Sequence, residues 1–196
     1  MNKLMLLIVM MSLLACKGDK NASADGTTPA ANAAPVVEKP KFDERLPDAC
    51  SLLSEDLVVD IIGGQKGAVE IKDGSHSQNL FSRACFFKWE DPGVKNAGIM
   101  VQVMLNPVEH DEPEYLSIYI ASKKTSGETS MGGEKVLYKD FPGFGDDGAY
   151  SYTFHKYMWR QGNDFSYMIA FNTVMTEAEE LAAAKRIATA IMKKVQ

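Results

Sequence analysis

Two neighbouring carboxylates in a glycine-rich stretch are the clearest candidates for chemistry in this sequence. Asp146 and Asp147 lie in FPGFGDDGAY, where the glycines allow backbone conformations that other residues rarely adopt. Carboxylate oxygens can bind a hard cation such as Ca²⁺, but the spacing lacks the alternating oxygen ligands and the distant glutamate of an EF-hand loop. The negative charges also disfavour a phosphate. We therefore favour a bend whose aspartates close turns, and we keep a metal site at Asp146 and Asp147 as the alternative.

The histidines do not form a metal-binding motif. They are scattered along the chain, at His76, His110 and His155. His110 lies among acidic residues in 109–112, a set that could ligate zinc, but acids just before a predicted helix are also favourable for its dipole. Neither H-x-x-x-H nor H-E-x-x-H occurs, so zinc catalysis has no support from the pattern. His155 stands among aromatic residues and is interpreted as a surface or packing residue.

No pattern for covalent catalysis is present either. The sequence contains no G-x-S-x-G nucleophile elbow. Several methionines recur at alternate positions of predicted strands, which indicates sheet packing rather than a copper site; they include Met100, Met104, Met158 and Met168. We therefore expect no catalytic residues and no cofactor. The alternative is an envelope hydrolase or metal-dependent enzyme built on the Asp146–Asp147 loop or the His110 region.

Residues 1–15 are predicted to be a lipoprotein signal peptide. One basic residue, Lys3, precedes an apolar run from Leu4 to Ala15, whose helical length of about 18 Å is too short for a bilayer core of about 30 Å. The end of the run, Leu13-Leu14-Ala15-Cys16, resembles the lipobox of bacterial lipoproteins. That resemblance implies cleavage before Cys16 and acylation of Cys16 with diacylglycerol and a further chain such as palmitate, which together anchor stably. The alternative is a plain secreted protein whose Cys16 is coincidental.

The chain after the signal divides into a tether and one domain. Residues 16–45 are rich in Ala, Asn, Pro, Thr and Lys, a composition that cannot bury enough apolar surface to fold. Residues 46–196 are long enough for a single globular domain with its own core. The balance of 21 Lys and Arg against 26 Asp and Glu, without a basic cluster, argues against a nucleic-acid partner. Lys17 after the lipid-bearing residue favours the outer membrane, on its periplasmic or surface face, over the inner membrane.

Two cysteines remain once Cys16 carries lipid. In an exported protein such an even pair favours a disulfide between Cys50 and Cys85. A redox-active pair is more often spaced C-x-x-C, so a structural cross-link is the better interpretation. It would close a loop of about 35 residues and contribute roughly 3–4 kcal/mol in the chain-entropy model.

Helix signals occur at three places. Ser54 can cap a short helix that ends at Gly63, because it precedes acidic residues and an apolar stripe. Residues 115–124 have helical spacing of apolar residues, although the alternation of Ile118 and Ile120 also allows a strand. Thr176-Glu177-Ala178-Glu179 is a capping box that begins the last helix. Its expected buried stripe is Leu181, Ala184, Ile187, Ile191 and Val195.

Strand signals fill the segments between these helices. They lie at 68–71, 84–89, 98–105, 135–139, 149–160 and 164–172, with a polar loop at 125–133 and a hairpin turn at 161–163. Cys85, Phe87 and Trp89 share one face of their strand. The order of helix, strands, helix, strands and helix predicts an α+β fold, with helices packed on an antiparallel sheet.

Aromatic residues crowd the predicted strand 149–160. Tyr150, Tyr152 and Phe154 have one parity, and Tyr157 and Trp159 have the other, so both faces of a continuous strand would be aromatic. One face would pack on helices. The other would be either an exposed binding surface or a second buried face.

Four stretches resemble a known group of proteins. They are ACSLLSEDLVVDIIGG, RACFFKW, FPGFGDDGAYSY and MWRQGNDFSYMIAF, followed by an alanine-rich helix. This series is similar to exported bacterial lipoproteins of unknown function whose domain resembles the extrinsic photosystem protein PsbP. The resemblance implies an anchored, non-enzymatic α+β domain outside the cytoplasm, and it supplies no catalytic residues. We therefore expect a binding or structural module of the cell envelope that engages a protein, a glycan or a small apolar ligand through its sheet.

Overall fold

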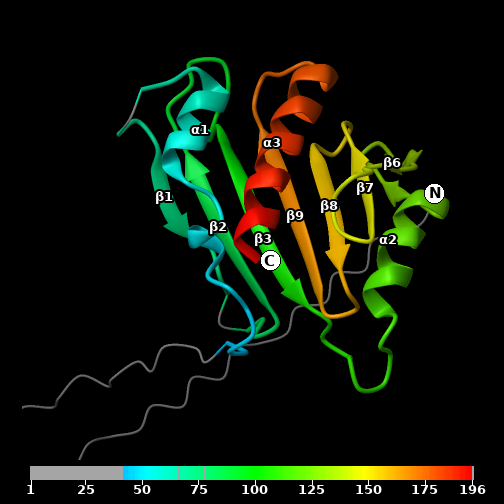
Figure 1. Ribbon diagram of the computed structural model, residues 1–196. Helices are drawn as coiled ribbons and strands as arrows, with labels where there is room; N and C mark the ends of the chain where they lie inside the picture. Colours follow the sequence, from blue (N-terminus) through cyan, green and yellow to red (C-terminus); the bar gives the residue numbers. More distant parts are fainter. Residues whose placement is uncertain (1–41, 66, 77, 196) are drawn as a thin grey trace, which may run out of the picture. The chain divides into compact units, whose positions relative to one another are not determined.

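The fold is of the α+β class, as the order of elements predicts. The computed structural model describes residues 42–65, 67–76 and 78–195, so the predicted signal peptide, Cys16 and most of the predicted tether lie outside the described residues. Within these ranges a seven-stranded antiparallel sheet carries helices on its two faces (Figure 1). A separate two-stranded hairpin joins β4 (Glu128–Thr129) to β5 (Lys135–Val136), within and beyond the predicted polar loop.

The centre of the sheet pairs two strands from distant parts of the chain, β3 and β9. The strand order is β1-β2-β3-β9-β8-β7-β6. The bounds are β1 (Glu70–Asp73), β2 (Ser82–Lys88), β3 (Gly98–Leu105), β6 (Lys139–Asp140), β7 (Asp147–Ser151), β8 (Lys156–Gln161) and β9 (Phe165–Asn172). Gly98 of β3 stands opposite Asn172 of β9, and Leu105 stands opposite Phe165.

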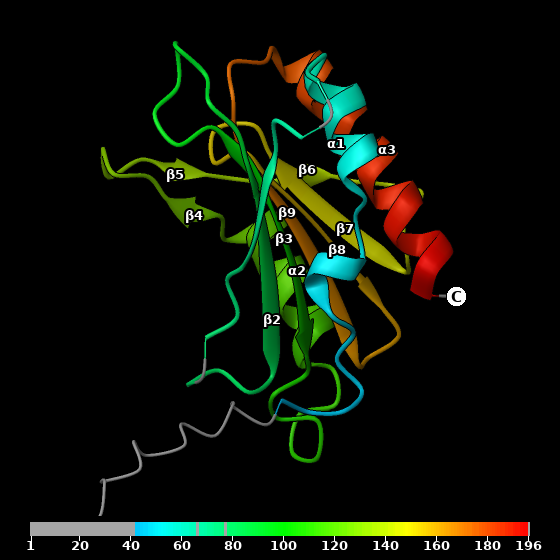
Figure 2. The same cartoon turned by 90° about the vertical axis from the view of Figure 1, so that its left-hand side faces the viewer.

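Two helices cover one face of the sheet, which we call the core face. α1 (Glu55–Ile62) begins where the Ser54 hydroxyl accepts a hydrogen bond from the amide of Leu57, and it ends at Gly63 with φ of +63°. α3 (Glu177–Val195) begins with the predicted capping box, in which the Thr176 amide donates to Glu179 over 2.9 Å. Both helices lie on the same side of the sheet, away from the β4–β5 hairpin (Figure 2).

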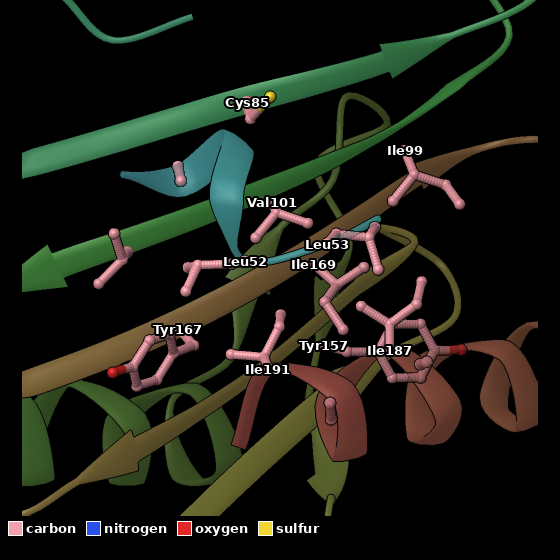
Figure 3. Close-up of a cluster of buried hydrophobic side chains, with 14 of the residues drawn as sticks. Leu52, Leu53, Cys85, Ile99, Val101, Tyr157, Tyr167, Ile169, Ile187 and Ile191 are labelled. Atoms are coloured by element: carbon pink, nitrogen blue, oxygen red, sulfur yellow. The ribbon is translucent and has the colours of Figure 1, made fainter. Parts of the chain in front are cut away.

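Strict alternation along the central strands builds the core on that face. Four alternate residues of β3 are at most 1% exposed, namely Ile99, Val101, Val103 and Leu105. They meet Ile169 of β9 and the buried side of α3, including Ile187 and Ile191 (Figure 3). The predicted stripe of α3 is therefore largely confirmed, with Ala183 and Ala188 buried as well and with Leu181 and Val195 half-buried at its margin.

The predicted disulfide is present and fixes the start of the domain to the sheet. Cys50 lies in a short 3₁₀ helix, η1 (Ala49–Ser51), and is bonded to Cys85 of β2, with 4.9 Å between their Cα atoms. Packing extends further toward the N-terminus, because Phe42 lies against the core and under the guanidinium group of Arg83.

The prediction of one continuous strand over 149–160 is wrong. The chain turns at residues 152–155, so β7 and β8 are two strands of a hairpin. The turn reverses the parity, and Tyr150 and Tyr157 are cross-strand partners whose stacked rings lie 5.3 Å apart. These two rings and Trp159 are all buried on the core face, at 9%, 0% and 0% exposure. The expected strand at 135–139 is likewise divided, between β5 and β6 of different sheets.

The third helix lies on the opposite face of the sheet and covers only part of it. The segment α2 (Tyr115–Thr125) is helical, which resolves the alternative of a strand. It packs over β7 and β8, where Ile120 joins Tyr138, Ala149 and Met158 in a second, smaller core.

A half-buried carboxylate holds α2 in this place. Glu128 of β4 accepts hydrogen bonds from Lys123 of α2 at 2.8 Å, from Lys156 of β8 at 2.9 Å and from the Tyr138 hydroxyl at 2.9 Å. Partial burial acts to raise the pKa of Glu128, but these three donors outweigh it and lower the pKa to about 2. The ionised carboxylate therefore links the helix to the sheet across the whole neutral range.

We predict that the free energy of unfolding falls in acid because Glu128 loses its charge and its ion pairs. Because the folded-state pKa is below that of the unfolded chain, Glu128 stabilises the fold above about pH 4.5, and this contribution is lost as the pH falls toward 2. Glu128→Gln should therefore remove about 2 kcal/mol at pH 7 and flatten the pH dependence between 5 and 2, as measured by urea unfolding. The exposed Glu134→Gln is the matched control and should leave the profile unchanged. An unaltered profile for Glu128→Gln would contradict the role of this cluster.

Candidate functional site

Asp146 and Asp147, the alternative metal ligands of the sequence analysis, lie beside different cationic side chains. The Asp146 carboxylate accepts the amide of Gly162 at 2.7 Å and lies 3.5 Å from the guanidinium group of Arg160. Asp147 lies 2.8 Å from the ammonium group of Lys124. Over residues 42–65, 67–76 and 78–195, no three His, Cys, Asp or Glu side chains are grouped in a way that could hold a metal ion.

The same loop has the geometry of a tight bend. Gly145 has φ of +57°, and a Cβ atom there would lie 1.9 Å from the carbonyl oxygen of Arg160. A side chain at this position would therefore clash with β8, which explains the glycine without a ligand. The geometry supports the interpretation of FPGFGDDGAY as a bend leading into β7.

His110 and His76 are exposed and stand apart from each other. His110 lines an open hollow of about 550 Å³ together with Arg45, whose guanidinium group is paired with Glu109 at 2.8 Å. His76 accepts the amide of Gln78 in a local turn. Among the described residues, neither histidine makes a contact with a serine, cysteine or acid that would form a catalytic arrangement.

His155 forms the buried polar contact that the sequence did not predict. Its Nδ1 lies 2.7 Å from a carboxylate oxygen of Glu180, a residue of α3 whose side chain is 0% exposed. His155 has φ of +53°, an uncommon conformation for a residue with a side chain, and its ring meets the edge of the Tyr152 ring at 5.1 Å. The pair therefore fixes the β7–β8 turn to the first turn of α3.

A periodicity in α3 could have indicated this burial. Glu180 precedes Ala184 by four positions and Ile187 by seven, so it lies on the apolar stripe that packs on the sheet. Acidic residues at the start of a helix are usually explained by the helix dipole. Because that explanation seemed sufficient for Glu180, its place in the apolar stripe was not predicted.

Burial and the nearby Glu180 charge also raise the pKa of Tyr157, so this phenol stays protonated in the cluster.

The feature with the best prospect for binding is the uncovered part of the sheet. On the side opposite α1 and α3, α2 covers β7 and β8 and reaches Met168 of β9. In the described part of the chain no helix lies over β2 and β3 on this side (Figure 2). We call this surface the open face. Its partly exposed apolar residues are Phe86, Met100, Met104, Met168 and Ala170. They stand side by side, because Phe86 pairs with Met100, and Met100 pairs with Ala170.

Two neighbouring hollows mark the open face. One of about 440 Å³ is lined by Phe86, Met100 and Ala170 and is bordered by the polar ends of Lys88 and Asn172. The other, of about 200 Å³, lies between the sheet and α2 and is lined by Met104, Met158, Met168 and Tyr119. Polar groups here are few, and one of them, Gln102, donates a hydrogen bond of 2.7 Å to Ser82. The open face therefore offers apolar contact rather than polar chemistry.

Comparisons with known proteins give no family for this chain. No family model matches it, and neither the curated proteins nor the solved structures yield a significant match. Across the described part of the chain, no helix has both the length and the apolar character needed to cross a bilayer. The functional interpretation therefore depends on the residues and their geometry.

We predict that the His155–Glu180 contact supports the fold. His155→Ala should lower the free energy of unfolding by about 2–3 kcal/mol, because it leaves a fully buried carboxylate without its histidine partner. Glu180→Gln in the same background should recover part of that loss, as measured by a double-mutant cycle in urea. Strictly additive losses would show that the two side chains do not stabilise each other.

Proposed function

We propose that this protein is a lipid-anchored lipoprotein of the cell envelope that binds an apolar ligand on the open face of its sheet and catalyses no reaction. The observation that carries this proposal is the open face itself, an apolar strip across three strands with two adjoining hollows. Small-molecule sites are typically concave, largely apolar and provided with a few polar groups.

The lining of the open face favours an apolar ligand over a glycan or a charged one. Methionine side chains are flexible and polarizable, so Met100, Met104 and Met168 can adapt to ligands of different shape. The aromatic ring of Phe86 adds a rigid contact at one end. An acyl chain or the apolar side of a partner segment fits this chemistry, and we favour the acyl chain because the hollows follow one another along β3 and β9.

Support for the lipid anchor comes from the sequence. Leu13-Leu14-Ala15-Cys16 has the residue types of a lipobox, and Cys50 and Cys85 are bonded to each other, which leaves Cys16 as the cysteine available for lipid. The resemblance to exported lipoproteins with a PsbP-like domain agrees with this address. Lys17 favours the outer membrane as the destination.

A non-catalytic role agrees with the polar side chains of the domain. Asp146 and Asp147, on which an envelope hydrolase or metal enzyme would depend, are engaged by Arg160 and Lys124. No contact in the described structure favours that alternative, so we propose no reaction.

Loss of the acylated sulfur should release the protein. Cys16→Ser should move the chain from the membrane fraction to the soluble fraction of an expressing bacterium, and the wild-type mature N-terminus should carry the mass of attached acyl chains in mass spectrometry. Ala15→Ser is a suitable control, because a small residue before the cut preserves cleavage. An unmodified wild-type N-terminus in the medium would contradict anchoring.

A charge in the centre of the open face should abolish ligand binding. Met168→Glu places a carboxylate in the lining of the smaller hollow, at a partly exposed position. Circular dichroism and urea unfolding should first show that this variant is folded, because Met168 also packs against the Ile120 cluster. We expect at least a tenfold loss of affinity for dansyl-labelled undecanoic acid, followed by fluorescence titration. The matched control is Ile118→Glu, an equal change of charge on the 61% exposed outer side of α2, which should bind like the wild type. Equal binding by both variants would place the ligand elsewhere.

A further inference from the structure

Trp89 separates two hollows at the end of the sheet where β2 finishes. The first, of about 440 Å³, lies between α1 and α3, and the second, of about 410 Å³, lies along the β2–β3 loop. Trp89 and Asp91 line both of them. The indole is half-buried and packs against the core, so its position is fixed while part of its surface faces the hollows.

The loop that carries Trp89 is held in a defined conformation. The Trp89 amide donates to the carbonyl oxygen of Ala97 at 3.2 Å. The side-chain amide of Asn172 donates to the carbonyl oxygens of Lys95 at 3.0 Å and Asn96 at 2.7 Å. Asn96 has φ of +58°, a left-handed conformation that asparagine adopts more readily than most residues with a side chain. A ligand at Trp89 would therefore meet a surface that is already ordered, which reduces the entropy lost on binding.

The walls combine apolar and polar groups. The first hollow is lined by Ile61 of α1, by Ala182 of α3 and by Trp89. The polar groups at its edge are Arg186 and Glu179. Thr173 also lines this hollow, but its hydroxyl oxygen is buried beneath the surface and has no hydrogen-bond partner among the described residues.

Charges of both signs line each hollow, which argues against a charged ligand. Glu179 and Asp91 are balanced in part by Arg186, whose guanidinium group is itself paired with Asp60. The second hollow has the acids Glu70, Glu90 and Asp91 with the bases Lys88 and Lys95. Neither a phosphate nor an ammonium group would find a consistent field there. A neutral ligand with many hydroxyl groups would, because each hydroxyl both donates and accepts hydrogen bonds.

We propose that these hollows form a binding site for a neutral oligosaccharide, with Trp89 between two adjacent sugar rings. The apolar face of a sugar ring can cover an indole ring while its hydroxyls meet polar groups at the rim. Carboxylates of Asp91 and Glu179 accept hydrogen bonds from the sugar, and Arg186 donates to it. This site is proposed in addition to the one on the open face, and its second hollow shares Lys88 and Asn96 with the larger hollow there.

The test uses the mature full-length chain with Cys16→Ser, titrated calorimetrically with chitotetraose, cellotetraose and maltotetraose. At least one tetrasaccharide should bind, and its disaccharide should bind at least fivefold more weakly, because it can fill only one hollow. Binding should also change tryptophan fluorescence, and this signal should come from Trp89, since Trp159 is fully buried. The absence of binding by all three tetrasaccharides, or equal affinities for the short and long forms, would overturn the proposal.

Variants test whether the sugar binds at Trp89. Trp89→Ala should weaken binding at least tenfold, and Trp89→Phe should weaken it less, because an aromatic ring remains. Asp91→Asn preserves the side-chain oxygen that accepts the Gly93 amide and should weaken binding at least threefold, which keeps the test valid if Trp89→Ala fails to fold. Met168→Glu on the open face should bind sugar like the wild type. Undiminished binding by both Trp89→Phe and Asp91→Asn would show that the sugar binds elsewhere.

Discussion

The structure depends on an imbalance between the sheet and its helices. Seven strands present two faces, but α1 and α3 cover the core face while α2 covers only the β7–β8 part of the other. On the core face, alternate residues of β3 and β9 are fully buried, as Val101 and Ile169 show. On the open face their neighbours Met100 and Met168 remain partly exposed. Because successive side chains alternate, every residue that strengthens the core leaves a neighbour on the side that lacks cover.

Polar contacts determine which part of the sheet α2 covers. Glu128 holds Lys123 of α2 and Lys156 of β8, so the helix lies over the hairpin and not over the centre of the sheet. The His155–Glu180 contact holds the tip of the same hairpin against α3 on the core face. The β7–β8 hairpin is thus fixed from both sides, whereas β2 is fixed from the core face, through Cys85. The open face exists because no equivalent contact brings a helix over β2 and β3 in the described structure.

Local patterns predicted those parts of the fold that local physics decides. Ser54, Gly63 and the Thr176 capping box mark helix ends correctly, since each acts on backbone groups within a few residues. The turn at 152–155 could not be found in this way. It contains no glycine, proline or asparagine, and the unusual conformation of His155 is stabilised by Glu180, 25 residues away. The methionine alternation was visible, but whether a helix covers it depends on where α2 docks. The hollows beside Trp89 likewise arise from the spacing of α1 and α3.

The position of β9 in the sheet has a consequence for how the chain acquires its structure. The last strand in the sequence is the central one, between β3 and β8. Until it arrives, the β2–β3 and β7–β8 hairpins have no common partner, and isolated hairpins are marginal in water. The sheet therefore closes only through contacts of high sequence separation, which form slowly. The centre of the sheet therefore cannot assemble before the C-terminal segment of the chain is available.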